Sequence, residues 1–124
     1  MPEFYLDEDW NLVKAPMTME DLASWGNFYQ QKYFPGVEPN VSVAINTNPK
    51  FEGAACFDPS TMMIHIAERI TPLEKMTRIA LLHEMVHVKL YLEDAKHHAG
   101  EDHGERFKDE IKRLMDAGAY DGLL

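Results

Sequence analysis

The chain has 124 residues, of which 45% are hydrophobic, and a formal net charge of −9, as is typical of one folded domain with a single core. The acidic balance argues against strong, non-specific binding to nucleic acid, which requires clustered Lys and Arg. The single Cys56 excludes an internal disulfide and a cysteine-based zinc ribbon. Since we find neither a membrane-length apolar run nor a signal peptide pattern, we expect a cytoplasmic protein without a membrane partner.

The N-terminal segment, residues 1–17, shows no clear periodicity, and we expect a partly ordered arm followed by one domain over residues 18–124. Thr18, with Asp21 three residues later, predicts a helix start with a capping box. Pro35-Gly36 predicts the end of this helix. Between these points the apolar and aromatic residues that recur at helical spacing are expected to pack in the core rather than bind a ligand: Leu22, Trp25, Tyr29 and Tyr33.

Three short segments, 41–46, 51–57 and 62–67, then alternate in side-chain character with the period of a strand. Short turn clusters separate them, which predicts an antiparallel meander. Within this small, three-stranded, largely antiparallel sheet we place segment 62–67 at an edge, where a substrate chain can add itself as a strand. His65 is expected to be structural or exposed rather than a metal ligand.

The next segment, residues 73–94, contains no Gly or Pro and predicts a long helix. Thr71-Pro72 followed by Glu74 predicts its start, as an N-cap, a first-position proline and a capping-box acid. Two apolar rows on this helix include His83, His87 and Glu84, so we expect all three side chains to face inward: Met76, Ala80, His83, His87 and Leu90 form one row, and Leu73, Thr77, Leu81, Glu84 and Val88 the other.

Residues 83–87 read His83-Glu84-Met85-Val86-His87, an HExxH pattern. Two histidines four apart on a helix project from the same face and can hold one zinc ion while leaving coordination positions open. The glutamate between them is placed to hold a zinc-polarised water as a general base. Burying two histidines and a carboxylate without a metal or partner is costly, which favours a zinc site over an ordinary core helix.

A polar stretch over residues 95–102 leads into a final helix whose Phe107, Ile111 and Leu114 share one face and whose predicted terminator is Gly118. Asp102 and Glu105 stand at N-cap and N3 spacing, which places His103 in the first turn. A hydrolytic zinc site usually has three protein ligands. The pattern HExxHxxGxxH is not met, which leaves glutamates of the last helix or His103 as the third ligand: Glu105, Glu110 and His103.

HExxH at 83–87, a polar loop and then His103-Gly104-x-x-Phe107 together resemble the SprT-like zinc metallopeptidase family, which is Spartan-related, over residues 18–118. The resemblance implies a zincin-like α+β fold, with an N-terminal helix, a small sheet, a long HExxH helix and a C-terminal helix. It also implies that His83, His87 and His103 bind Zn2+, that Glu84 is the general base and that Phe107 packs beneath the site.

The chain departs from the family pattern in that Asp102-His103-Gly104-Glu105 stands where members often carry Gly-His-Gly-Pro. We expect a minimal core without the C-terminal zinc ribbon or the DNA-binding extensions of many relatives. For this reason the repair of DNA–protein crosslinks is not carried over, and the acidic charge disfavours nucleic acid as a partner.

We therefore expect a zinc-dependent metallopeptidase that hydrolyses peptide bonds in a protein substrate by Glu84-assisted attack of a zinc-bound water. The alternative is a non-enzymatic, zinc-stabilised interaction or regulatory module, in which a loop residue closes the metal site: His97, His98 or Glu101. Four residues are candidates for stabilising the oxyanion, and the sequence does not choose among them: Tyr91, His97, Arg106 and Tyr120.

Overall fold

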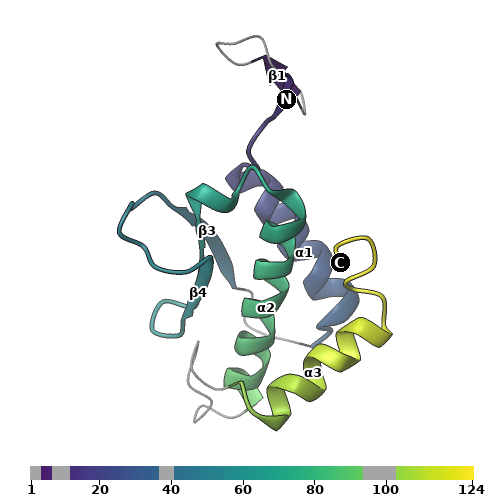
Figure 1. The fold of residues 1–124 in the computed structure, drawn as a ribbon. Helices are drawn as coiled ribbons and strands as arrows, with labels where there is room; N and C mark the ends of the chain where they lie inside the picture. The colour runs from purple at the N-terminus through teal and green to yellow at the C-terminus, as the bar shows by residue number, and fades with distance from the viewer. Residues whose placement is uncertain (1–3, 7–11, 37–40, 94–102) are drawn as a thin grey trace.

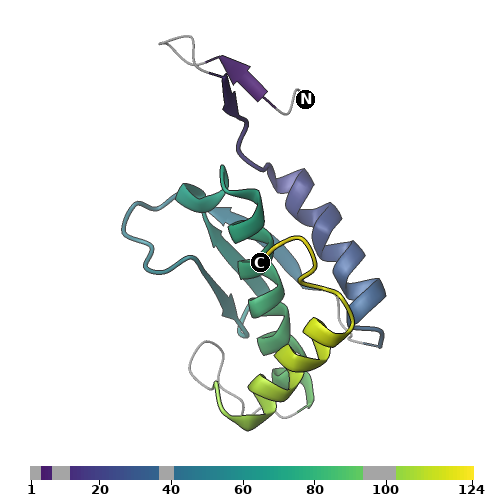
Figure 2. The same ribbon diagram turned by 45° about the vertical axis from the view of Figure 1, so that its right-hand side comes forward.

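The computed structural model describes residues 4–6, 12–36, 41–93 and 103–124. Its elements are β1 (Phe4–Leu6), β2 (Leu12–Lys14), α1 (Met19–Tyr33), β3 (Ser42–Asn46), β4 (Ala55–Asp58), β5 (Met63–Ala67), the short 3-10 turn η1 (Glu68–Ile70), α2 (Glu74–Glu93) and α3 (Glu105–Asp116). The predicted α+β class and the order of its main elements are confirmed. Figures 1 and 2 show α2 at the centre, with strands β3 to β5 on one side and α1 and α3 on the other.

The sheet is mixed rather than a meander, with the strand order β3-β5-β4. β4 pairs with β5 antiparallel, as predicted, but β3 pairs with β5 in parallel. Segment 62–67 therefore lies in the central strand, and its placement at an edge was wrong. A short turn joins β4 to β5 as a hairpin, whereas the longer β3–β4 connection leaves room for β5 between its neighbours.

Strand β4 is shorter than the alternation over residues 51–57 predicts. It begins only at Ala55. Arg69 holds the preceding residues, since its guanidinium donates to the carbonyl oxygen of Phe51 at 2.9 Å and to that of Gly53. These carbonyls bond the arginine that follows β5 and take no part in the strand pairing.

Helix α1 begins and ends as predicted. The capping box is present, with the Thr18 backbone N–H bonded to Asp21 Oδ2 at 2.9 Å and the Asp21 N–H bonded to Thr18 Oγ1 at 3.1 Å. The helix ends at Tyr33, directly before Phe34-Pro35. Tyr29 and Tyr33 are buried and the Tyr29 ring stacks on that of Trp25 at 5.5 Å, so the predicted core packing holds for these residues, while the neighbouring Phe28 is 45% exposed.

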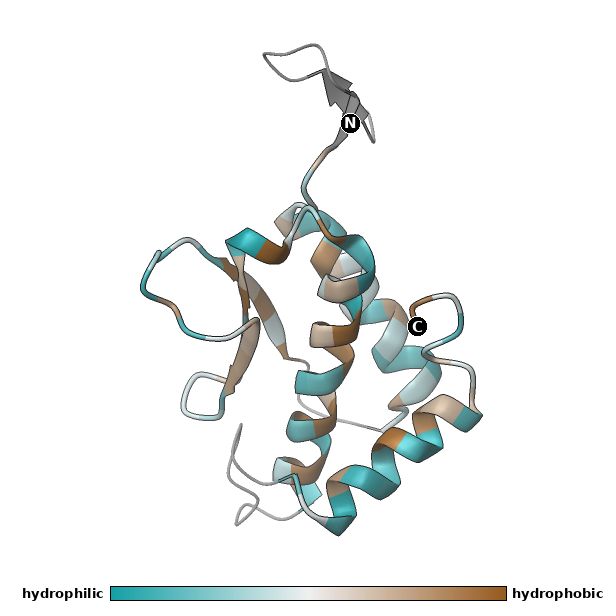
Figure 3. Cartoon of the chain, viewed as in Figure 1, coloured by the Kyte–Doolittle hydropathy of each residue, from teal (hydrophilic) through white to brown (hydrophobic). Residues whose placement is uncertain are grey.

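Helix α2 begins at Glu74, and the predicted cap is wrong. The Thr71 hydroxyl donates to the Glu68 carbonyl at 2.7 Å and closes η1 instead of capping α2. The inward rows hold only from the second turn onward: Leu73 and Met76 are exposed, while Leu81, Glu84, His87, Val88 and Leu90 are buried. These buried residues face the sheet and the last helix, and Figure 3 shows the strands largely in the brown of apolar residues.

Helix α3 begins at Glu105 with Gly104 as its N-cap. His103 therefore directly precedes the cap and does not lie in the first turn as predicted, while Asp102 lies outside the described residues. The end of the helix was predicted correctly: Gly118, at φ +89°, donates its N–H to Met115 at 3.1 Å, and the Ala119 N–H bonds the Leu114 carbonyl at 2.9 Å. This pair of bonds is the Schellman motif that favours glycine.

The N-terminal segment contains an antiparallel pair, β1 with β2, in which Phe4 lies opposite Lys14. The pair extends away from the helices (Figures 1 and 2). The following chain joins the body at Met17, whose N–H bonds the Thr71 carbonyl at 2.9 Å. None of the helices in the described ranges is long and apolar enough to cross a membrane.

Candidate metal centre

Three histidines from two parts of the chain meet at one point. His83 and His87 lie one turn apart on α2, and His103 directly precedes Gly104, the N-cap of α3. His103 Nε2 lies 3.2 Å from His83 Nε2 and 3.2 Å from His87 Nε2. Among the described residues, these three side chains form the group able to hold a metal ion.

The separations of the ring nitrogens fit a single ion. Zinc binds histidine nitrogen at about 2.0 Å, and two such ligands at a tetrahedral angle lie about 3.3 Å apart. The 3.2 Å distances are close to this value. Neutral imidazole is a common ligand of zinc and of other transition metals, so the donor set fits a metal of this class.

Burial differs among the three histidines. His87 is 0% exposed, His83 is half-buried and His103 is exposed, so the cluster extends from the interior to the surface at His103. Burial lowers the pKa of His83, and the neighbouring His103 lowers it further. Both effects favour the neutral imidazole that binds metal.

The ring of Phe107 packs against all three histidines, as predicted. Its centroid lies 4.8 Å from those of His83, His87 and His103. Phe107 is on the first turn of α3, so this contact joins the beginning of α3 to the middle of α2. The ring covers one side of the histidine cluster with apolar surface.

Glu84 lies beside the cluster and is 5% exposed. Burial raises its pKa to about 7, against the opposing effect of a hydrogen bond from the backbone N–H of Phe57. Its Oε2 has no hydrogen-bond partner among the described residues. A buried carboxylate oxygen without a partner is unusual in a folded protein and is typical of a site that receives a ligand or water.

The strand next to Glu84 is β4, which forms one edge of the sheet. The Ala67 N–H bonds the Ala54 carbonyl at 2.8 Å. Because antiparallel pairs alternate, the backbone groups of Ala55 and Phe57 turn away from β5. Sequence alternation indicated this strand, but its place at the edge beside Glu84 depends on the strand order, which no local pattern encodes.

The other ligand candidates do not join the cluster. Glu110 is paired with Lys89, at 2.7 Å, and with Arg113, and neither it nor Glu105 belongs to the metal-binding group of the described residues. His65 lies on β5, with its ring 6.4 Å from that of Phe51. The loop candidates His97, His98 and Glu101 lie outside the described residues.

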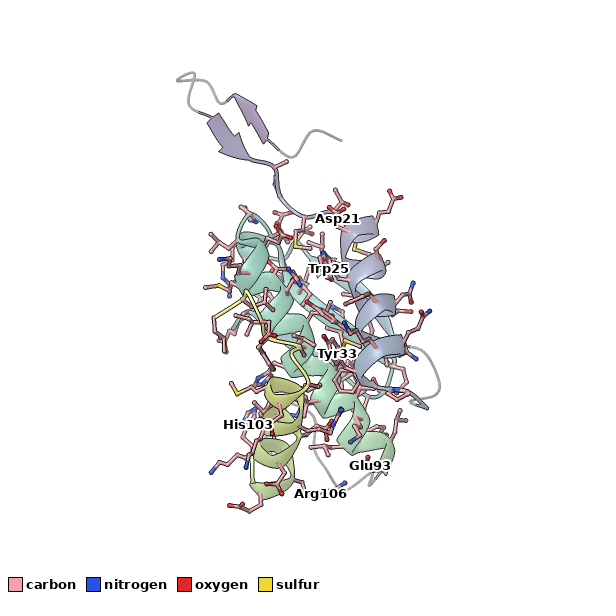
Figure 4. The ribbon with its side chains drawn as sticks, turned by 90° about the vertical axis from the view of Figure 1, so that its right-hand side faces the viewer. Asp21, Trp25, Tyr33, Glu93, His103 and Arg106 are labelled. Carbon is pink, nitrogen blue, oxygen red and sulfur yellow. The ribbon has the colours of Figure 1, made fainter. Side chains whose placement is uncertain are left out.

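The candidates for stabilising an oxyanion have different surroundings. Tyr91 packs its ring against Phe57, at 5.9 Å. Arg106 forms an ion pair with Glu93 at 3.1 Å, and Figure 4 shows both residues at the opposite end of the molecule from Asp21. Tyr120 is buried in the C-terminal segment, and this burial raises its pKa to about 12.

Comparison with known proteins agrees with this geometry. The model of the SprT-like family matches residues 22–122, a range that contains all three histidines, Glu84 and Phe107. The comparison with curated proteins and with solved structures finds no match. Because the family model covers most of the sequence and the predicted resemblance rests on the residues that meet in the cluster, the chain belongs to the SprT-like family.

Proposed function

We propose that this protein is a zinc-dependent peptidase that hydrolyses peptide bonds in a protein substrate. The observation that carries the proposal is the pairing of two features: three histidine nitrogens around one point, and a buried carboxylate beside them with one unpartnered oxygen. His83, His87 and His103 are the proposed zinc ligands. Membership of the SprT-like family supports the same activity.

Zinc bound at this centre would supply a Lewis acid that polarises a carbonyl and lowers the pKa of water. Glu84 takes the proton from the attacking water and passes it to the nitrogen of the leaving amine. Burial raises the pKa of Glu84 in the metal-free protein, as is typical of a carboxylate that must both accept and release a proton near neutral pH. The Phe57 N–H holds the carboxylate in place through these steps.

The substrate chain is proposed to lie along β4, in place of the segment 62–67 expected from the sequence. β4 is an edge strand, and the backbone groups of Ala55 and the carbonyl of Phe57 turn away from β5, while the Phe57 N–H bonds Glu84. An extended peptide can add to such an edge through main-chain hydrogen bonds. The scissile bond is then brought close to Glu84, which Phe57 contacts.

The proposed activity is tested with a denatured protein as substrate. We expect the zinc-loaded protein to produce fragments, a chelator to stop their production, and added zinc to restore it. Fragments that persist at the same rate in the presence of chelator, or no fragments from the zinc-loaded protein, would contradict the proposal.

Tyr91 is the proposed donor to the oxyanion, because it packs on the strand that contacts Glu84. Tyr91→Phe keeps the ring and removes the hydroxyl. Loss of one such donor costs a factor of about 100 in kcat, so we expect a fall of this size with unchanged zinc content. Steady-state kinetics on a peptide substrate measures it, with Tyr120→Phe as the matched control. Equal kcat for Tyr91→Phe and wild type would remove Tyr91 from this role.

The alternative, a zinc-stapled module without activity, is disfavoured because structural zinc sites are usually closed by four protein ligands, and three are grouped among the described residues. The cytoplasmic setting stays a prediction. A nucleic-acid partner, which the family resemblance allows, stays disfavoured by the acidic charge. Stimulation of cleavage by single-stranded DNA at low salt would favour such a partner.

A further inference from the structure

An ionic cluster around one buried carboxylate ties α3 to the rest of the molecule one turn beyond the metal centre. Glu110 is only 7% exposed, and Lys89 of α2 donates to its Oε2 at 2.7 Å. Arg113 donates from Nε to its Oε1 at 2.7 Å and from Nη2 to the Tyr33 carbonyl at 2.7 Å. We call Glu110, Lys89, Arg113 and the Tyr33 carbonyl the Glu110 clamp; it joins α3 to both α2 and α1.

The clamp adjoins the metal centre without belonging to it. Phe107, Glu110 and Leu114 are the buried residues of α3, spaced so that they share its inward face. Phe107 contacts the three histidines, and Glu110 follows one turn later. On the opposite helix, Lys89 lies two residues after His87. The Glu110 carboxylate thus contacts α2 close to the proposed ligands, although it is not one of them.

The contacts of the clamp differ in kind from the apolar contacts on the same face. Apolar burial is roughly proportional to area and has no direction of its own, and the buried Phe107 and Leu114 contribute to the packing of α3 in this way. Charge-assisted hydrogen bonds are short and directional. Burial alone would raise the pKa of Glu110, but the bonds from Arg113 and Lys89 outweigh it and the pKa is lowered, as expected for a carboxylate that stays ionised between two cations.

We propose that Glu110 is a positioning residue that sets the register of α3 against α2 and thereby holds His103 in reach of His83 and His87. This role rests on the zinc site proposed above. Three ligands meet only when α3 is docked against α2 as it is in this structure. The apparent zinc dissociation constant rises as the docked fraction falls, so weakening the clamp weakens zinc binding through His103.

A double-mutant cycle tests this coupling with wild type, Glu110→Gln, His103→Ala and the double variant. Zinc and copper(II) affinities are measured by competition with a chelating dye; copper(II) binds the two histidines left in the His103→Ala proteins more tightly than zinc does. We expect Glu110→Gln to raise the dissociation constant about tenfold when His103 is present. With His103 absent, we expect a change smaller than about twofold.

Two further variants separate positioning from other effects. Asp109→Asn removes the same charge from the neighbouring, exposed position and is expected to leave metal affinity unchanged. Lys89→Met keeps the aliphatic stem, removes one arm of the clamp, and should weaken zinc binding in the same direction as Glu110→Gln. Thermal unfolding of the metal-free proteins measures how much stability each substitution removes. A loss of stability alone should be the same with and without His103, so it does not make the effect of Glu110→Gln on metal affinity depend on His103.

The outcomes distinguish this role from the proposed function. If wild type binds zinc and Glu110→Gln binds it equally well, or if the fold-change is the same with and without His103, the positioning role is overturned while the peptidase proposal stands. If wild type binds no zinc, both are overturned. A fold-change confined to the proteins that contain His103 supports the role.

Discussion

Glu84→Gln is expected to retain zinc and to lose peptidase activity by a factor of about 1,000 in kcat. The amide matches the carboxylate in shape and can still meet the Phe57 N–H, but it cannot accept the proton of the attacking water. Because the proposed metal ligands are the three histidines and Glu84 is not one of the ligands, the zinc content should not change. Kinetics on a peptide substrate, together with elemental analysis, measures both quantities on one preparation.

The matched control for this variant is Glu74→Gln, which makes the same change in the first turn of α2, away from the histidines. It should retain full activity. Retained activity in Glu84→Gln would remove the residue from its assigned role, and loss of zinc together with activity would make it a structural support of the centre.

His103→Ala is expected to weaken zinc binding by a factor of at least about 100 and to abolish cleavage. Residues that only support metal ligands already change affinity by about 10- to 100-fold when mutated, and His103 supplies one of three nitrogens at the centre. Competition with a chelator measures the affinity.

His65→Ala provides the comparison for this variant, since it removes a histidine that lies on β5 with its ring near Phe51. Its zinc affinity should equal that of wild type. Tight zinc binding by His103→Ala would show that the third ligand is another residue.

The sequence predicted those features that depend on neighbours along the chain. The capping box at Thr18 and the Schellman end at Gly118 each involve a few consecutive residues. The HExxH spacing placed His83 and His87 on one helix face by geometry alone. The spacing of residues alone did not decide the identity of the third ligand, and His103 was preferred because of the resemblance to the family.

The features that were predicted wrongly depend on contacts between distant segments. A period-two alternation shows that a segment is a strand but carries no information on its neighbour, so the insertion of β5 between β3 and β4 was missed. The sequence indicated no partner for Lys89 of α2. Its pairing with Glu110 could be recognised only after α3 was placed against α2.

The capping of α2 was predicted wrongly for a related reason. Thr71-Pro72-Glu74 has the residue types of a helix start, but the Thr71 hydroxyl is used by the turn that follows β5. Two local structures compete for one side chain there, and the tertiary path of the chain decides between them.

The central claim, a zinc centre formed by three histidines, is tested most directly by the metal content of the purified protein. Elemental analysis is predicted to find one zinc ion per chain in the wild type and none in a variant with alanine at positions 83, 87 and 103. A wild type without stoichiometric zinc, or a triple variant that retains it, would contradict the account.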